Sequence, residues 1–155
     1  MKILFVFMGN ICCSPTVEAV ARIEFARAGL DIEVRSAGTE NYHIGAAADR
    51  RAIAVAEAHG YPMAAHRARQ LCVADFTEFD HLLAMDQTNL DAILRMAPPQ
   101  RCDRVSLFLP FAGISRPLEL PDPYYGGSAD FQRALDLARD GILSFTRRLK
   151  SSGRA

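Results

Sequence analysis

The sequence lacks a net charge, an export signal and a membrane-spanning run. Its 18 lysines and arginines balance 18 aspartates and glutamates, so overall charge gives no reason to expect nucleic acid or an anionic membrane as a partner. The apolar stretch that starts at Ile3 is too short to cross a bilayer. The Gly-Asn and Ser-Pro pairs that follow it fit a strand and a loop better than a secretory signal. We therefore expect a cytoplasmic protein without membrane contact.

Metal-ligand patterns and a nucleotide-binding P-loop are also missing. The four cysteines, Cys12, Cys13, Cys72 and Cys102, form no Cys-x-x-Cys pair, and no second cluster of Cys or His completes a zinc site beside the first two. Without an export signal, reduced thiols are expected rather than disulfides. No Gly-x-x-x-x-Gly-Lys-Ser/Thr run occurs, which weighs against a nucleotide site. The sequence thus predicts no metal and no cofactor.

What is present is an alternation of strand and helix patterns. At 155 residues the chain has the size of one domain, which we expect over 1–150, with a frayed tail over 151–155. The patterns predict strands at 3–6, 32–34, 81–85 and 105–109. They predict helices at 15–29, 49–59, 90–94 and 131–149, a helical turn at 66–71, and a long ordered loop at 110–127. This order predicts a four-stranded parallel sheet with helices on both faces, a three-layer α/β/α fold with its ligands at the carboxyl ends of the strands.

The segment from Phe7 to Pro15 joins the first strand to the first helix and has the shape of a phosphate-cradling loop. The first turn of a helix leaves backbone N–H groups unpaired and carries partial positive charge, so the loop can hold an anion whatever its side chains are. We expect Asn10 to adopt a positive φ that bends the loop and Ser14 to donate a hydrogen bond inside it. The candidate loop residues are Met8, Gly9, Asn10, Ile11, Cys12 and Ser14.

These residues carry a resemblance to a known family. Gly9-Asn10-Ile11-Cys12, Ser14-Pro15 and Glu18-Ala19 resemble the loop of the low-molecular-weight protein tyrosine phosphatases, whose pattern is Cys-x-Gly-Asn-Ile-Cys-Arg-Ser-Pro. Further segments at 36–39, 42–45, 66–70, 80–90 and 121–124 extend the resemblance over most of the chain. It implies a phosphotyrosine phosphatase I-like fold and hydrolysis of phosphotyrosine or aryl phosphate monoesters through a phosphocysteine. It also places Phe7 at the position of the nucleophilic cysteine and Cys13 at that of the phosphate-binding arginine.

Both replacements remove chemistry that the family mechanism needs. The resemblance implies that a cysteine thiolate attacks phosphorus and that an aspartic acid, at the position of Asp122, protonates the leaving phenolate. Phe7 has no lone pair for the attack, and Cys13 cannot form the two-pronged contact of a guanidinium with phosphate. Removal of a covalent nucleophile costs on the order of 10⁶-fold in a well-studied hydrolase, so we expect trace turnover at most. We expect the ring of Phe7 to pack inward and extend the core.

Two other groups of residues have more than one interpretation. Tyr42, Tyr124 and Tyr125 resemble the aromatic walls of the family's pocket, although surface packing would explain them equally well. The basic segment at 66–69 resembles a nucleic-acid patch only superficially, because its two arginines fit a structural, hydrogen-bonding segment better. Cys12 and Cys13 are poor substitute nucleophiles, because neither has an arginine six residues further on.

The leading hypothesis is a member of this phosphatase family that is disabled. It would be either a pseudophosphatase or an inactive variant of a working enzyme, since each replacement needs only one base change. Its ligands would be a phosphotyrosine protein, an aryl phosphate, inorganic phosphate or sulfate, bound in a surviving cradle. One alternative is an active tyrosine phosphatase or arsenate reductase that uses a substitute residue. The other is a purely structural interaction protein with no affinity for phosphate.

Overall fold

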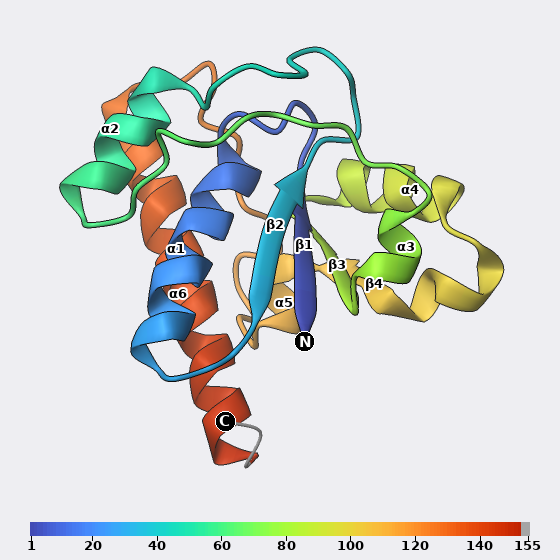
Figure 1. Ribbon diagram of the computed structural model, residues 1–155. Coiled ribbons are helices and arrows are strands. Elements are labelled where there is room, and N and C mark those ends of the chain that lie inside the picture. Colours follow the sequence, from blue (N-terminus) through green and yellow to red (C-terminus); the bar gives the residue numbers. More distant parts are fainter. Residues whose placement is uncertain (153–155) are drawn as a thin grey trace.

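The computed structural model describes residues 1–152 and contains one sheet of four parallel strands. In order across the sheet the strands are β2 (Glu33–Ala37), β1 (Lys2–Val6), β3 (His81–Ala84) and β4 (Val105–Leu107). β1 lies in the middle, paired along its length with β2 and with β3. The carboxyl ends of all four strands therefore meet at one edge of the sheet (Figure 1).

Helices cover both faces of this sheet. One face carries α1 (Cys13–Arg27), α2 (Arg50–Ala58), the short α5 (Phe108–Phe111) and the long α6 (Ser128–Ser151). The other carries α3 (Asp75–Glu78) and α4 (Gln87–Met96), and a 3-10 helix, η1 (Pro99–Arg104), leads into β4. Figure 1 shows the two groups on opposite sides of the strands. The predicted three-layer α/β/α fold is confirmed.

Alternation along β1 explains the two hydrophobic cores. Ile3 and Phe5 contribute to the larger core with α1 and α6, whereas Leu4 and Val6 contribute to the smaller core with α3 and α4. Successive side chains of a strand point to opposite faces, so a fully apolar strand buries both. The apolar stripe predicted on the last helix is confirmed. Its buried residues are Phe131, Ala134, Leu135, Ala138, Ile142, Phe145 and Leu149.

Two local predictions are wrong. Residues 66–71 form no helical turn; the segment runs extended past the end of β2, where Arg69 O accepts from Gly38 N and Leu71 N donates to Gly38 O. The fourth strand ends at Leu107 instead of 109, because Phe108–Phe111 turns into α5. Pro110 has no N–H to donate to a strand partner but is tolerated in the first turn of a helix.

The predicted frayed tail at 151–155 begins within the last helix. Ser151 is the last residue of α6, and the part of the expected frayed tail from residue 153 onward lies outside the described residues. Within residues 1–152, no helix combines the length and apolar character needed to cross a membrane.

Candidate anion-binding site

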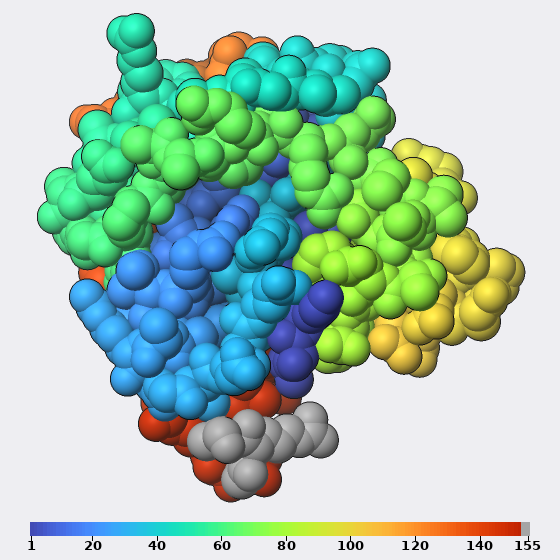
Figure 2. Space-filling view, viewed as in Figure 1, coloured from blue at the N-terminus to red at the C-terminus, as the bar shows by residue number. Residues whose placement is uncertain are grey.

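The loop between β1 and α1 lies at the carboxyl edge of the sheet. Phe7 N donates to Ala37 O of the neighbouring strand (3.1 Å), and Asn10 N donates back to Phe7 O (3.1 Å), so the chain turns as soon as β1 ends. Cys12 then precedes the first residue of α1, whose axis leads away from the sheet edge. In Figure 2, the segment coloured from cyan to green lies across this end of the molecule and covers much of the blue loop.

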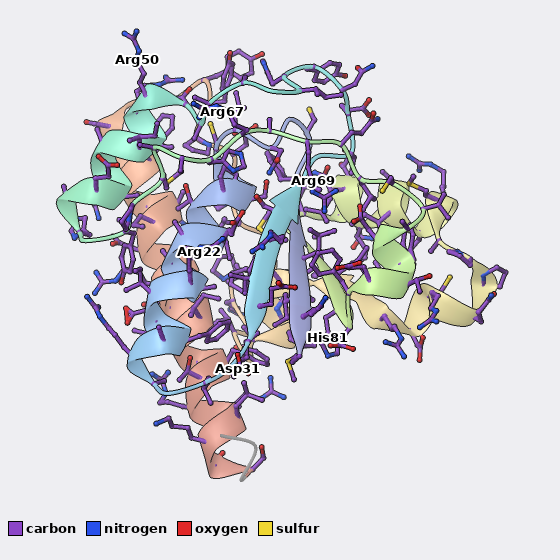
Figure 3. All side chains as sticks on the ribbon, in the orientation of Figure 1. Arg22, Asp31, Arg50, Arg67, Arg69 and His81 are labelled. Atoms are coloured by element: carbon purple, nitrogen blue, oxygen red, sulfur yellow. The ribbon has the colours of Figure 1, made fainter. Side chains whose placement is uncertain are left out.

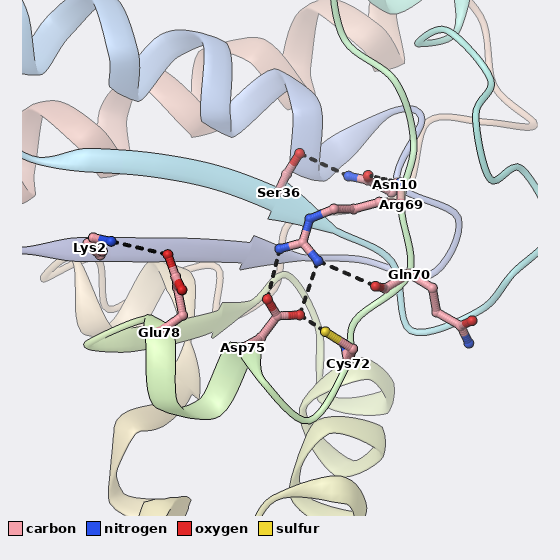
Figure 4. Close-up of polar contacts among 8 residues, drawn as sticks. All are labelled: Lys2, Asn10, Ser36, Arg69, Gln70, Cys72, Asp75 and Glu78. Atoms are coloured by element: carbon pink, nitrogen blue, oxygen red, sulfur yellow. Dashed lines mark hydrogen bonds and ion pairs between the residues drawn. The ribbon is translucent and has the colours of Figure 1, made fainter.

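Asn10 shapes the loop from inside the protein. Its φ is 59°, which confirms the predicted left-handed conformation, and its side chain is 1% exposed. The Nδ2 group donates to Ser14 Oγ and to Ser36 Oγ (both 2.9 Å), and Oδ1 accepts from Arg69 N (3.0 Å). One buried amide thereby fixes the helix start, the end of β2 and the extended segment, as Figure 4 shows for Ser36. Ser14 is hydrogen-bonded inside the loop, but its Oγ accepts from Asn10 Nδ2 and is not the predicted donor.

A second ring of contacts holds these partners. Glu18 Oε1 accepts from Ser36 Oγ (2.6 Å), and His66 Nε2 lies 2.7 Å from Asn10 O. Arg69 forms two hydrogen bonds with the Asp75 carboxylate, at 3.1 and 3.0 Å (Figure 4). The 66–69 segment is therefore structural, as predicted. The role of Asp75 was missed, because a single Asp in a short helix carries no signal for a partner six residues earlier.

Several backbone N–H groups of the loop have no acceptor. Within residues 1–152, no hydrogen bond is donated by the main-chain N–H groups of Gly9, Ile11, Cys12, Cys13 and Ser14. Gly38 allows the loop to lie this close to β2, since a Cβ there would stand 2.6 Å from Met8 O. Unpaired donors at a helix start favour an anion. The loop thus keeps the backbone features that bind a phosphate-like group.

Phe7 lies between the core and the loop cavity. It is 5% exposed and belongs to the same core as Ile3 and Phe5, which occupy the same face of β1. The prediction that it packs inward is confirmed, and the residue also forms part of the cavity wall. An aromatic ring at this position supplies neither charge nor an electron pair to a ligand.

The two cysteines of the loop are buried and uncharged. Burial, together with the nearby carboxylates of Asp49 and Asp122, raises the pKa of Cys12 to about 12. Burial raises the pKa of Cys13 well above its ordinary value, and Asp122 adds to this effect. The Cys13 thiol donates to Pro121 O (3.5 Å), so it is directed at the loop that carries Asp122.

A cavity of about 330 Å³ brings most of the predicted site together. It is lined by Phe7, Met8, Gly9, Asn10, Ile11, Cys12, Tyr42, His43, Asp122, Tyr124 and Tyr125. Cys13 and Ser14, both predicted for the site, lie behind this wall instead. His43 was not predicted as a site residue, although it belongs to the 42–45 segment of the resemblance; its ring lies so near Gly9 that a Cβ there would come within 2.9 Å of it.

Three tyrosines and the carboxylate of Asp122 line the outer part of the cavity. Tyr42 is 64% and Tyr125 is 95% exposed, and the rings of Tyr124 and Tyr125 meet edge to face with centroids 4.9 Å apart. Asp122 Oδ1 accepts from Tyr124 N (3.0 Å), which leaves Oδ2 facing solvent or a ligand. An aromatic ring that enters here would contact apolar walls and a hydrogen-bond acceptor.

Among residues 1–152, no arginine lines this cavity. Arg51 forms an ion pair with Asp49 (2.9 Å) and donates to Tyr124 O (2.9 Å). Arg69 is held by Asp75, and Figure 3 shows Arg50 pointing away from the body of the protein. Arg51 and Arg69 are therefore paired with carboxylates, and Arg50 is turned away. Residues 1–152 also contain no group of three or more His, Cys, Asp or Glu side chains placed to hold a metal ion.

The strand, the open loop and the helix start define a protein of the tyrosine phosphatase class. Residues 2–155 match the family model described as low molecular weight phosphotyrosine protein phosphatase, and the chain belongs to this family. A low molecular weight protein-tyrosine-phosphatase of Streptomyces coelicolor is 40% identical over 154 residues, covering 94% of this chain and 93% of the relative. A low molecular weight phosphotyrosine protein phosphatase of Schizosaccharomyces pombe is 41% identical over 136 residues, covering 84% of this chain and 85% of the relative.

Solved structures agree with this assignment. A protein tyrosine phosphatase of Entamoeba histolytica, crystallised with Hepes in its active site, superposes with a TM-score of 0.92 at 35% identity and covers 99% of both chains. Wzb of Vibrio vulnificus in complex with benzylphosphonate has a TM-score of 0.84 at 30% identity, covering 96% of this chain and 98% of that one.

Proposed function

We propose that this protein is a catalytically disabled low-molecular-weight tyrosine phosphatase that binds aryl phosphates without hydrolysing them. The observation that carries the proposal is the buried ring of Phe7 at the junction of β1 and the loop, where the family pattern has its nucleophile. A covalent phosphoryl intermediate needs a donor of an electron pair at that place, and phenylalanine has none. Cys13, at the position of the family arginine, points to Pro121 instead of the cavity.

The alternative of a substitute nucleophile requires a thiolate on Cys12 or Cys13. Because burial raises the pKa of Cys12 to about 12, its thiol keeps its proton at neutral pH. Cys13 is 1% exposed, and its thiol donates a hydrogen bond to the carbonyl oxygen of Pro121. These features favour a disabled site over an active phosphatase or an arsenate reductase that uses either residue.

Ligand binding is supported by the loop and the cavity. The unpaired N–H groups of the loop would receive the phosphate, and Tyr42, Tyr124 and Tyr125 would contact the ring of the ligand. Asp122 keeps the general-acid position beside the cavity. The complexes of relatives with Hepes and benzylphosphonate support the same type of ligand, and inorganic phosphate or sulfate would use the loop alone. A cytoplasmic location stays a prediction from the sequence.

Two measurements on the unmodified chain test this function. Hydrolysis of p-nitrophenyl phosphate should be at background, with no phosphorylated protein trapped by rapid acid quench. Calorimetry with phenylphosphonate, a non-hydrolysable aryl ligand, should show saturable binding. Turnover that disappears when Cys12 or Cys13 is changed to Ser would establish the substitute nucleophile. Absence of binding to phenylphosphonate, phosphate and vanadate would establish the structural interaction protein.

A further inference from the structure

A second and larger cavity lies on the other side of the loop that carries Asp122. Its volume is about 570 Å³, and it opens between the start of α4, the end of β4 and the segment 117–122. Asp122 lines this cavity as well as the anion-binding cavity, so the two share one wall. A ligand that fills the first cavity would therefore lie against Asp122, which also lines the second.

Three carboxylates face this second cavity, and each is fixed by the main chain through one oxygen. Asp86 Oδ1 accepts from Asn89 N (2.9 Å), Glu119 Oε2 accepts from Gln87 N (2.8 Å), and Asp122 Oδ1 accepts from Tyr124 N (3.0 Å). Within residues 1–152, the other oxygen of each carboxylate accepts no hydrogen bond and joins no ion pair. Each of the three carboxylates thus has one oxygen that is free to accept a hydrogen bond from a ligand in the second cavity.

The charge of this cavity is unbalanced, and its floor is apolar. Arg133 is the one cationic residue among its lining and takes part in no ion pair with another described residue. Three carboxylates against one guanidinium leave an excess of two negative charges at neutral pH. Leu107, Leu120 and the exposed Leu118 supply the apolar surface. A ligand that complements both features has an aliphatic stem that ends in a cation, which is the chemistry of a lysine side chain.

We propose that this cavity is a subsite for a lysine side chain that flanks the aryl phosphate in a peptide ligand. The proposal rests on the function proposed above, because it assumes that the aryl group occupies the first cavity. The shared wall at Asp122 then places the flanking residue over the three carboxylates. The ammonium group would donate to the open oxygens of Asp86 and Glu119, and the stem would pack on Leu118 and Leu120.

The test compares blocked tripeptides by calorimetry with the unmodified protein. Lys-phosphotyrosine-Lys should bind about 5-fold to 30-fold more tightly than norleucine-phosphotyrosine-norleucine, which keeps the stem but lacks the charge. The Glu-phosphotyrosine-Glu peptide should bind most weakly. Higher ionic strength should reduce the advantage of lysine, because these carboxylates are partly open to solvent. Lys-Ala-Lys measures the subsite without the aryl phosphate.

Variants separate this subsite from general attraction of a basic peptide. In the double variant D86N/E119Q each new amide keeps a carbonyl oxygen for the same main-chain N–H but loses its charge, so folding should be preserved. A matched control, E57Q/D140N, removes two charges at exposed positions outside both cavities. The advantage of lysine over norleucine should vanish in D86N/E119Q and persist in the control.

The outcomes for the two proposals can be distinguished. If the lysine and norleucine peptides bind equally, the subsite is wrong while the proposed aryl phosphate binding stands. An equal loss of the lysine advantage in both double variants would also overturn the subsite. If Lys-Ala-Lys binds and depends on Asp86 and Glu119 while phenylphosphonate does not bind, the subsite is supported and the proposed function fails.

Discussion

Cys13 donates its thiol hydrogen to the carbonyl oxygen of Pro121, across 3.5 Å and 108 residues of sequence. The contact ties the first residue of α1 to the loop before Asp122, and it directs the Cys13 side chain away from the cavity that Phe7 and Tyr124 line. Cys13 is 1% exposed, so its side chain offers no contact to a ligand at the loop, and only its backbone N–H is left to do so. An arginine side chain introduced at position 13 would therefore have to take a different direction to reach the cavity.

Under the proposed function, a cysteine at position 7 together with an arginine at position 13 should give the protein turnover. The double variant F7C/C13R gains a nucleophile that can lie at the helix start and a guanidinium that can bind two phosphate oxygens, whereas either single change supplies only half of this. We expect kcat/KM for p-nitrophenyl phosphate to rise by at least about 10³-fold in the double variant and to stay near background in F7C and C13R alone. Normal folding of all three should be checked by circular dichroism. An inactive but folded double variant would show that other parts of the site have changed too.

Loss of the Asn10 side chain should weaken the whole loop. N10A removes two buried hydrogen bonds and one partly buried one, and it places a residue other than Asn or Gly at φ 59°, so we expect a loss of about 2–4 kcal/mol in the free energy of unfolding. N10G, which tolerates this φ, should lose less. Urea titration measures both, with the exposed N41A as the control. Unfolding curves of N10A and N41A that coincide would contradict the central role of Asn10.

Alkaline pH should destabilise the protein through Cys12. Its pKa is raised from 9.0 to about 12 in the folded state, so the unfolded chain loses the thiol proton first as pH rises. The free energy of unfolding should therefore decrease between about pH 9 and pH 12, and this part of the decrease should disappear in C12A. Chemical denaturation of both proteins at several pH values tests the sign. The exposed Cys72, changed to Ala in both backgrounds, removes reagent-accessible thiol chemistry from the comparison.

A methyl group at Gly38 should push the loop out of place. The added Cβ would lie 2.6 Å from Met8 O and 3.2 Å from Asn10 N, both of them main-chain atoms that cannot rotate away. We expect G38A to lose about 2–4 kcal/mol of stability and to bind phenylphosphonate at least about tenfold more weakly. G127A is a matched control, since a Cβ there meets nothing within 4 Å. Unchanged binding in G38A would show that the loop does not depend on this approach.

The sequence predicted the sheet, the main helices and the loop, because their signals are local. The apolar run of β1 and the stripe on α6 report burial directly, and Asn10 is one of few residue types that tolerate positive φ. What it did not predict depends on distant contacts. Residues 66–71 are extended because they pair with Gly38, and the link between Arg69 and Asp75 has no periodic pattern.

In the cavity, too, some residues were predictable from local sequence motifs and others depend on contacts between distant segments. The loop residues from Met8 to Cys12, Asp122 and the tyrosines were predicted from matching motifs, and the structure brings them together around one cavity. The burial of Cys13 behind that wall and the presence of His43 in it follow from the path of loops far apart in the sequence. Neither could be read from composition or spacing.

The bond between His66 and the Asn10 carbonyl has a consequence for ligand binding. Ser36, His66 and Arg69, which surround Asn10, are distinct from Phe7 and Cys13. Under the proposed function, substitutions at positions 7 and 13 therefore change the chemistry of the site without removing the contacts that hold the loop, so affinity for a ligand can persist where turnover does not.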